Sequence, residues 1–360
     1  MVHSVTYSRI EGLRFFLAAL VVGQHLATFS QLHGRATPVT TMVGQGGDAA
    51  VMSFIMLSGF LTKIRYISLE GTLEFRTFLR RRIARIWPEY LPSLVCAGFL
   101  MSAWIAEHGQ SSNPTPLTTW SAISQVTLLH AWPWIGIGPG WNGVTWSLSI
   151  EWLLYLTTPI LLSLTRPLLQ FDRHVIPAIS FATIPLLEVQ FHILPASLSL
   201  VGRCAASYLA GILCGCHFIS SHQRRDSTRK LQLSGCAIVI AAMVLQFHLR
   251  ASAVYLMSLG TLCLLLGLTE SSIRFTGLQR QLWGVSYGIF LWHSLILGMI
   301  DLIFRDLRIT SLNHDLALSL AVFLASTTVA LLSKIFADEA TKKVQVLTSR
   351  LRLTNGAGTP

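Results

Sequence analysis

Three ionisable residues lie inside stretches that are otherwise almost entirely apolar: His25, Glu151 and His293. An ionisable side chain held away from water is costly, so each is a candidate for a functional role. Imidazole binds and releases protons near neutral pH, and a neighbouring carboxylate would fix its tautomer and raise its basicity. The pattern predicts a proton-transfer site, with a purely structural buried pair as the alternative.

Arg14 precedes His25 by eleven residues. On an α-helix this spacing amounts to three turns plus about 20°, so both side chains share a face about 16 Å apart along the axis. Glu151 stands in the segment 146–152, and we expect it to meet His25 at similar depth. The alternative is that Arg14 only extends toward an interface and His25 only bonds a neighbouring helix.

Two further patterns suggest a ligand. Arg82 and Arg85 share a helix face at i, i+3, and paired guanidinium groups suit phosphate oxygens. Ser58 and Gly59 are small residues in an apolar run, where a ligand or another helix can approach the backbone closely. The alternatives are an orientation or lipid-headgroup signal for the arginines and plain helix packing for Ser58-Gly59.

The composition identifies the class of protein that must position these residues. Of 360 residues, 52% are hydrophobic and 12% are charged, the mean hydropathy is +0.57 and the net charge is +11. So few charges cannot cover a water-facing surface, which excludes a soluble enzyme, a disordered chain and a secreted disulfide scaffold. The six cysteines have no metal-site spacing, so no metal is expected. A multi-span helical membrane protein remains.

About ten membrane-spanning helices are predicted, since each span needs roughly 20 apolar residues. The positive-inside rule places both termini in the cytoplasm, so the basic excess reflects topology and no nucleic-acid partner is expected. The segment 118–137 is expected to be interfacial or re-entrant. Residues 1–345 are expected to form one membrane domain, whose first apolar run is a retained span, and 346–360 a disordered tail. The spans are expected near 11–30, 46–62, 86–106, 146–165, 174–191, 203–220, 232–248, 252–269, 284–303 and 315–337.

Taken together, these segments resemble the membrane acyltransferase-3 family, bacterial integral-membrane O-acyltransferases of sugars and polysaccharides. Six blocks occur in family order across residues 9–293. They are R-x10-H at Arg14–His25, an F-F-x-L-S-G-F-L-like block at Ser53–Leu61, R-x-x-R-I-x-P at Arg82–Pro88, W-S-L-x-x-E-x-x-x-Y-x-x-x-P at Trp146–Pro159, an arginine–glycine pair at Arg203 and Gly211, and G-x-x-S-Y-x-x-Y-L-x-H at Gly284–His293.

The resemblance implies an acyl-CoA co-substrate, usually acetyl-CoA, presented from the cytoplasm, and no tightly bound cofactor. It implies that Arg82 and Arg85 meet the CoA phosphates and that the pantetheine arm passes Ser58-Gly59. His25, oriented by Glu151 and joined by Arg14 in the catalytic set, would deprotonate a sugar hydroxyl; a covalent acyl-histidine is the alternative mechanism. Supporting roles fall to Trp146, Ser147, Tyr155, Tyr287 and His293.

The implied acceptor is a glycan or glycolipid at the cell surface or in secretion, and the implied location is the bacterial inner membrane among its lipids. The loop 107–145 is the candidate for acceptor selection, because four tryptophans there could stack on sugar rings or anchor the membrane interface: Trp120, Trp132, Trp134 and Trp141. A second hypothesis is a transporter or flippase that uses Glu151, His25 and His293 as a proton relay. The oligomeric state is not readable from the sequence.

Overall fold

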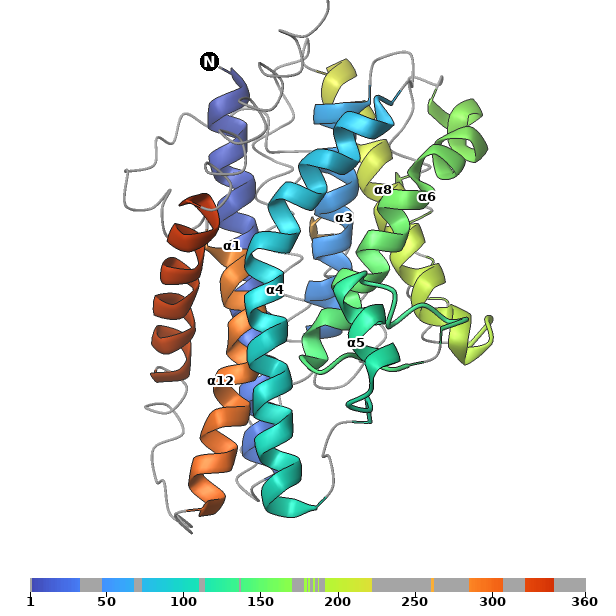
Figure 1. Cartoon of the computed structure of the whole chain (residues 1–360). Helices are drawn as coiled ribbons and strands as arrows, with labels where there is room; N and C mark the ends of the chain where they lie inside the picture. The colour runs from blue at the N-terminus through green and yellow to red at the C-terminus, as the bar shows by residue number, and fades with distance from the viewer. Residues whose placement is uncertain are drawn as a thin grey trace, which may run out of the picture.

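The described chain is a bundle of α-helices in a computed structural model (Figure 1). The structure describes residues 2–32, 47–67, 73–109, 114–135, 137–169, 178–179, 181, 184, 187, 192–221, 260–261, 285–306 and 321–339. The helices are α1 (Val2–Leu32), α3 (Gly47–Tyr66), α4 (Phe75–His108), α5 (Thr119–Val126), α6 (Trp146–Leu169), α8 (Ala196–Ser221), α12 (Ser286–Asp306) and a last helix (Ala321–Glu339), with a short 3-10 turn at Gly143–Thr145. The predicted all-α class is confirmed.

Six of the described helices are long and apolar enough to cross a membrane. They lie at the expected first, third, fourth, sixth, ninth and tenth spans, and α3 covers the expected second span. The expected spans near 232–248 and 252–269 fall outside the described residues apart from 260–261, and only a few positions of 174–191 are described. The number ten therefore stays a prediction, as does the tail 346–360, which is also outside the described residues.

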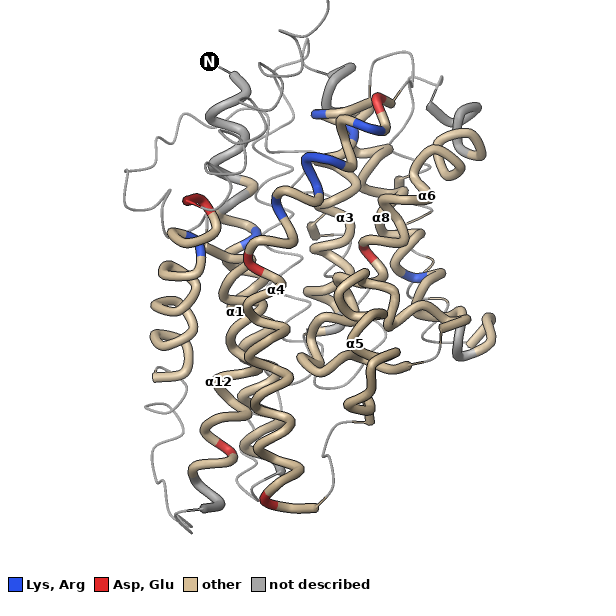
Figure 2. Tube along the Cα trace, viewed as in Figure 1, with Lys and Arg blue, Asp and Glu red and all other residues tan. Residues whose placement is uncertain are grey.

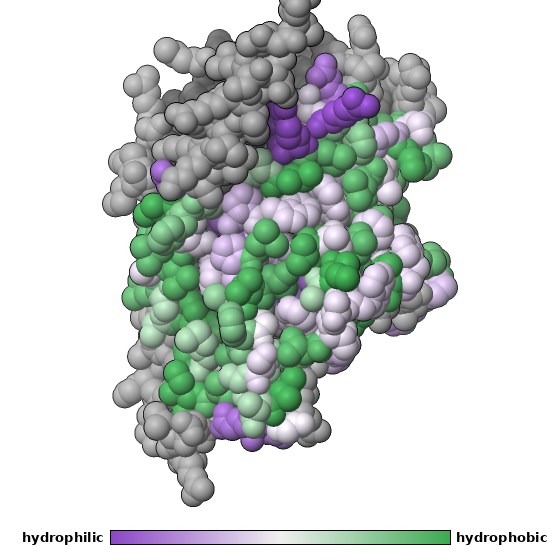
Figure 3. Space-filling model, in the orientation of Figure 1, coloured by the Kyte–Doolittle hydropathy of each residue, from purple (hydrophilic) through white to green (hydrophobic). Residues whose placement is uncertain are grey.

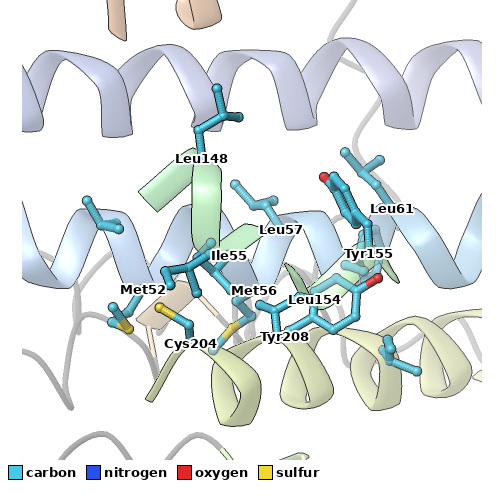
Figure 4. Packing of buried hydrophobic residues seen from close by; sticks show 14 of the residues in the cluster. Met52, Ile55, Met56, Leu57, Leu61, Leu148, Leu154, Tyr155, Cys204 and Tyr208 are labelled. Carbon is cyan, nitrogen blue, oxygen red and sulfur yellow. The ribbon is translucent and has the colours of Figure 1, made fainter. Parts of the chain in front are cut away.

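Helix α3 lies at the centre, between α1 and α8 (Figure 1). A Cβ added to Gly59 would lie 2.0 Å from the Tyr208 carbonyl oxygen, and one added to Gly211 would lie 1.9 Å from the Met56 carbonyl oxygen. Two glycines thus bring the backbones of α3 and α8 into contact. Figure 4 shows Met56 and Tyr208 among the side chains that fill the remaining space between them. Gly59 therefore serves helix packing, the alternative to close approach by a ligand in the sequence analysis.

Helix α12 packs against α1 on one side and α4 on the other (Figure 1). Apolar side chains from α1, α12 and the last helix form one buried cluster there, including Val22, Ile289 and Val322. The Tyr287 hydroxyl donates to the Ile86 carbonyl oxygen at 3.3 Å, which ties α12 to α4. Through these contacts α12 holds His293 against α1.

Helix α4 begins at Phe75, well before the expected start of the third span near residue 86. The arginines of 76–85, expected between the second and third spans, therefore lie on the first turns of a 34-residue helix that continues through Pro88 and Pro92. Hydropathy locates only the part of a helix that crosses hydrocarbon, so it missed these turns. In Figure 2 the Lys and Arg residues of α3 and α4 gather at the end of the bundle where α1 begins. We call this the basic end and define it by Arg65, Arg76, Arg80 and Arg81, all exposed.

A broad apolar band covers the face of the bundle below the basic end (Figure 3). Large apolar side chains are well exposed on several helices, among them Phe99 at 73%, Leu164 at 73% and Phe336 at 74%. A water-facing surface would not carry such a band, whereas lipid would cover it. The surface therefore agrees with a membrane-spanning bundle.

The segment between α4 and α6 folds back onto both helices. The Tyr90 hydroxyl of α4 donates to the Gln125 carbonyl oxygen at 2.9 Å, and the Trp132 indole donates to the Ser149 carbonyl oxygen of α6 at 3.1 Å. Helix α5 has eight residues, too few to span a membrane. This agrees with the expected interfacial or re-entrant segment, which packs over the first turns of α6.

Candidate functional site

Glu151 lies in a cluster of hydroxyl groups. On α6 its Oε1 accepts hydrogen bonds from the Ser58 hydroxyl of α3 and from the Tyr155 hydroxyl one turn further along α6. The Ser58 and Tyr155 oxygens are 3.3 Å apart. A carboxyl group held away from water needs such partners, so the two hydroxyls supply Glu151 with hydrogen bonds inside the bundle.

Arg82 is the positive counterpart of this cluster. It is 4% exposed, and its Nη2 donates to the Thr62 hydroxyl at 3.0 Å. Its guanidinium carbon lies 4.5 Å from the ring centre of Tyr155 and 5.3 Å from that of Phe78, within range of cation–π attraction. Tyr155 thus contacts both residues, Arg82 at its ring and Glu151 at its hydroxyl.

The two arginines of the R-x-x-R pattern have different surroundings. Arg82 is enclosed by aromatic rings, whereas Arg85 is half-buried and close enough to Glu89 to interact electrostatically. The spacing predicted that both would bind phosphate from one helix face. In the structure, packing buries Arg82 and leaves Arg85 partly exposed. The exposed cations nearby are Arg80 and Arg81.

His25 pairs with His293. Nδ1 of His25 lies 3.3 Å from Nε2 of His293, and the ring centres are 5.0 Å apart in an edge-to-face arrangement. His293 is fully buried, while His25 is partly exposed. We call these two residues the histidine dyad. Glu151 and His25 were expected to meet, but each has other partners. Glu151 contacts Ser58 and Tyr155, and His25 contacts His293.

The reason for this difference is the depth at which α6 begins. The Ser149 hydroxyl donates to the Leu128 carbonyl oxygen at 2.8 Å and accepts from the Ala131 amide at 3.2 Å, so the first turns of α6 lie beneath the folded segment. Glu151 is thereby displaced toward the basic end and comes to the level of Arg14, about 16 Å along α1 from His25. The expectation assumed that the span starts at the membrane surface.

Arg14 and Glu151 line one pocket. The pocket has about 520 Å³ of empty space, a figure that includes space open to the surroundings. Its wall also includes Phe290, whose ring centre is 6.3 Å from that of His293, so the pocket adjoins the histidine dyad. The lining residues are Arg14, Val51, Phe54, Ile55, Ser58, Ser147, Leu148, Glu151, Ser286, Tyr287 and Phe290. Four expected supporting or catalytic residues thus meet with Ser58 in one cavity.

Several polar residues of the site escaped the sequence analysis. Thr62 accepts from the Tyr208 hydroxyl at 3.2 Å as well as from Arg82, and the Tyr208 oxygen lies 3.0 Å from that of Thr158. The i, i+4 spacing of Ser58 and Thr62 in an apolar run was a usable signal. Tyr208 had no such signal, because its partners come from distant helices.

The four loop tryptophans divide into two pairs. Trp132 and Trp141 donate their indole N–H groups to backbone carbonyls, so both stabilise the folded segment. Trp120 and Trp134 are 57% and 63% exposed. Of the four, these two are the ones that present a large surface to lipid or to a ligand.

The folded segment also contains a buried histidine outside the candidate spans. His130 is fully buried near Thr145, and burial lowers the pKa of its imidazole to about 4. Nearby, Asn142 donates its side-chain amide to the Leu291 carbonyl oxygen at 2.8 Å, which connects this segment to α12. Neither residue was singled out from the sequence.

No three His, Cys, Asp or Glu side chains gather as a metal site anywhere in the part of the chain that the structure describes. The cysteines that the structure describes form no disulfide: Cys96, Cys204, Cys214 and Cys216.

The acyltransferase domain of the acyltransferase-3 family matches residues 7–335, nearly the whole chain. The chain belongs to this family. A curated relative, the acyltransferase MdmB of Streptomyces mycarofaciens, is 31% identical over 164 residues. That alignment covers 44% of this chain and 39% of the relative, so the chain spans well under two thirds of the relative's length. No solved structure matches the chain. Family membership confirms the resemblance and favours an enzyme over a transporter.

Proposed function

We propose that this protein transfers an acyl group, most simply acetyl, from acyl-CoA to a sugar hydroxyl of a cell-surface or secreted glycan in the bacterial inner membrane. The observation that carries this proposal is the position of His25. Its ring is paired with His293 next to a pocket that holds an arginine, a carboxylate and hydroxyl groups. Acyl transfer to a hydroxyl needs a base, and His25 is placed to supply it.

The donor enters from the basic end. Acyl-CoA carries several phosphates at one end and the thioester at the other, joined by a thin pantetheine arm. The exposed Arg80 and Arg81, with the half-buried Arg85, are suited to the phosphates. Arg82 is enclosed by aromatic rings, so we assign it a structural role.

The pocket receives the arm. Arg14 lies three helical turns toward the basic end from His25, so it cannot contact the same carbonyl group as the base. It is placed to bind a polar part of the arm, together with Ser58 and Glu151. The thioester then extends past Phe290 toward the histidine dyad.

The chemistry is a single displacement. His25 removes the proton of the acceptor hydroxyl, and the oxygen attacks the thioester carbonyl carbon. The carbon–sulfur bond breaks, the CoA thiolate leaves, and it takes the proton that His25 held. The products are the glycan ester and CoA.

The test measures ester-linked acetate on surface and secreted glycans of cells that lack the gene. These cells are complemented with the wild-type gene or with His25→Ala, at equal amounts of protein in the membrane. We expect acetate to return with the wild type and not with His25→Ala. If both genes restore the acetate, His25 is not the base. If neither restores it, the proposed acceptor or the proposed acyl group is wrong.

A further inference from the structure

Each histidine of the dyad hydrogen-bonds a backbone carbonyl one turn earlier on its own helix. Nδ1 of His25 lies 2.9 Å from the Val21 oxygen, and Nδ1 of His293 lies 3.0 Å from the Ile289 oxygen. A carbonyl oxygen only accepts, so each Nδ1 carries a hydrogen. In a neutral imidazole the lone pair is then on Nε2.

The contact between the two rings therefore has a direction. It joins Nε2 of His293 to Nδ1 of His25 at 3.3 Å. Because Nε2 of His293 holds a lone pair, it accepts the Nδ1–H of His25, which is shared with the Val21 carbonyl. The lone pair of His25 is consequently at its own Nε2.

We infer that His293 is a positioning residue that, together with the Val21 carbonyl, holds the tautomer and orientation of His25, an inference that rests on the proposed function. Nε2 of His25 is the atom that receives the acceptor's proton. When it does so, the O–H bond breaks, an N–H bond forms at Nε2, and Nδ1–H remains in place. The bond from Nδ1–H to His293 then becomes charge-assisted and stronger.

His293 can fill this role because its own orientation is fixed. Its side chain has no exposed surface, its Nδ1 is held by the Ile289 carbonyl, and its ring packs near Phe290. A neutral ring thus does at this site what a carboxylate does in a Ser-His-Asp triad. The sequence had given that task to Glu151.

Two substitutions separate positioning from folding. In His293→Gln the side-chain carbonyl reaches the place of Nε2 and can still accept from His25. In His293→Asn the shorter amide reaches only the place of Nδ1, so the acceptor is lost. Both keep a polar group of moderate size, and only variants that reach the membrane at wild-type levels are compared.

The assay uses membranes of the gene-deleted host that contain each variant. It follows the incorporation of radiolabelled acetyl-CoA into alkali-labile material, with rate and KM for acetyl-CoA measured separately. We expect His293→Asn to lower the maximal rate about 100-fold with KM unchanged, and His293→Gln to stay within about tenfold of wild type. Adding His293→Asn to His25→Ala is expected to cause no further loss, because the two residues act as one unit.

Equal activity of His293→Asn and wild type, or an additive loss in the double variant, would overturn the inference while leaving the proposed function intact. Equal loss in His293→Asn and His293→Gln would also overturn it. Absence of incorporation by the wild type would instead refute the proposed function, and full activity of His25→Ala would refute its base.

Discussion

Glu151 and His25 are both polar residues inside apolar helices, but the bundle surrounds them differently. Glu151 is held by two hydroxyl donors, and the ring of one of them, Tyr155, also contacts the Arg82 guanidinium. His25 meets a second imidazole, and each ring is anchored to the backbone of its own helix. The first cluster joins α3, α4 and α6, while the dyad joins only α1 and α12.

The difference shows how one bundle separates two tasks. A carboxyl group held by two hydroxyl donors is a hydrogen-bonded unit that loses stability when one member is removed. A neutral ring pair with defined tautomers is suited to moving a proton. We therefore assign donor binding and structural support to the Glu151 cluster and proton transfer to the dyad.

The largest effect is expected from Glu151→Ala. This change leaves the Ser58 and Tyr155 hydroxyls without their acceptor, at a cost of about 1–3 kcal/mol for each hydroxyl in the free energy of unfolding. Thermal unfolding in detergent, followed by tryptophan fluorescence, measures the loss. Glu151→Gln keeps an acceptor in place and is expected to lose less; equal losses would show that hydroxyl contacts are irrelevant here.

The next effect is expected where α3 meets α8. Gly211→Ala places a methyl group against the Met56 carbonyl, which should displace α3 and cost about 1–3 kcal/mol. Gly143→Ala is the matched control, because among the described residues no atom beyond its chain neighbours and its own helix backbone lies within 4 Å of its added Cβ. The same unfolding assay compares the two, and an unchanged Gly211→Ala would contradict the close contact of these backbones.

A smaller effect is expected from His130, a buried histidine outside the dyad, on the pH dependence of stability. Because the pKa of His130 falls from an ordinary 6.5 to about 4, the folded protein resists protonation that the unfolded chain accepts. The free energy of unfolding therefore keeps its full value above pH 6.5 and falls as the pH drops toward 4. The fall is about 1 kcal/mol between pH 6.5 and 5.5. His130→Gln is expected to reduce the fall in unfolding temperature between these pH values. If it leaves that fall unchanged, His130 is not the group that titrates.

The smallest effect concerns the arginines at the basic end. Arg81→Gln removes one exposed cation and should raise the KM for acetyl-CoA two- to fivefold, with stability unchanged, since each exposed charge contributes about 1 kcal/mol or less. Arg82→Gln should instead lower the unfolding temperature. The opposite pattern, in which Arg82→Gln raises only the KM for acetyl-CoA, would show that Arg82 binds the CoA phosphates.

The sequence predicted the class, most span positions and the polar residues worth following. Apolar runs and basic flanks are local properties, so α1, α6 and α12 could be found without a structure. The separation of His25 from Glu151 could not, because it depends on the depth at which α6 begins. That depth is set by the folded segment between α4 and α6. Similarly, i, i+3 spacing put Arg82 and Arg85 on one face, but only packing shows that Tyr66, Phe78 and Tyr155 enclose one of them.

The most direct measurement compares His25→Gln and Glu151→Gln in the acetyl-CoA assay at equal amounts of folded protein. If the dyad performs proton transfer and the Glu151 cluster binds the donor, His25→Gln lowers the maximal rate at least 100-fold with KM for acetyl-CoA unchanged. Glu151→Gln then acts mainly by raising that KM. A lost rate in Glu151→Gln with a preserved rate in His25→Gln would contradict the account and make the carboxylate the base.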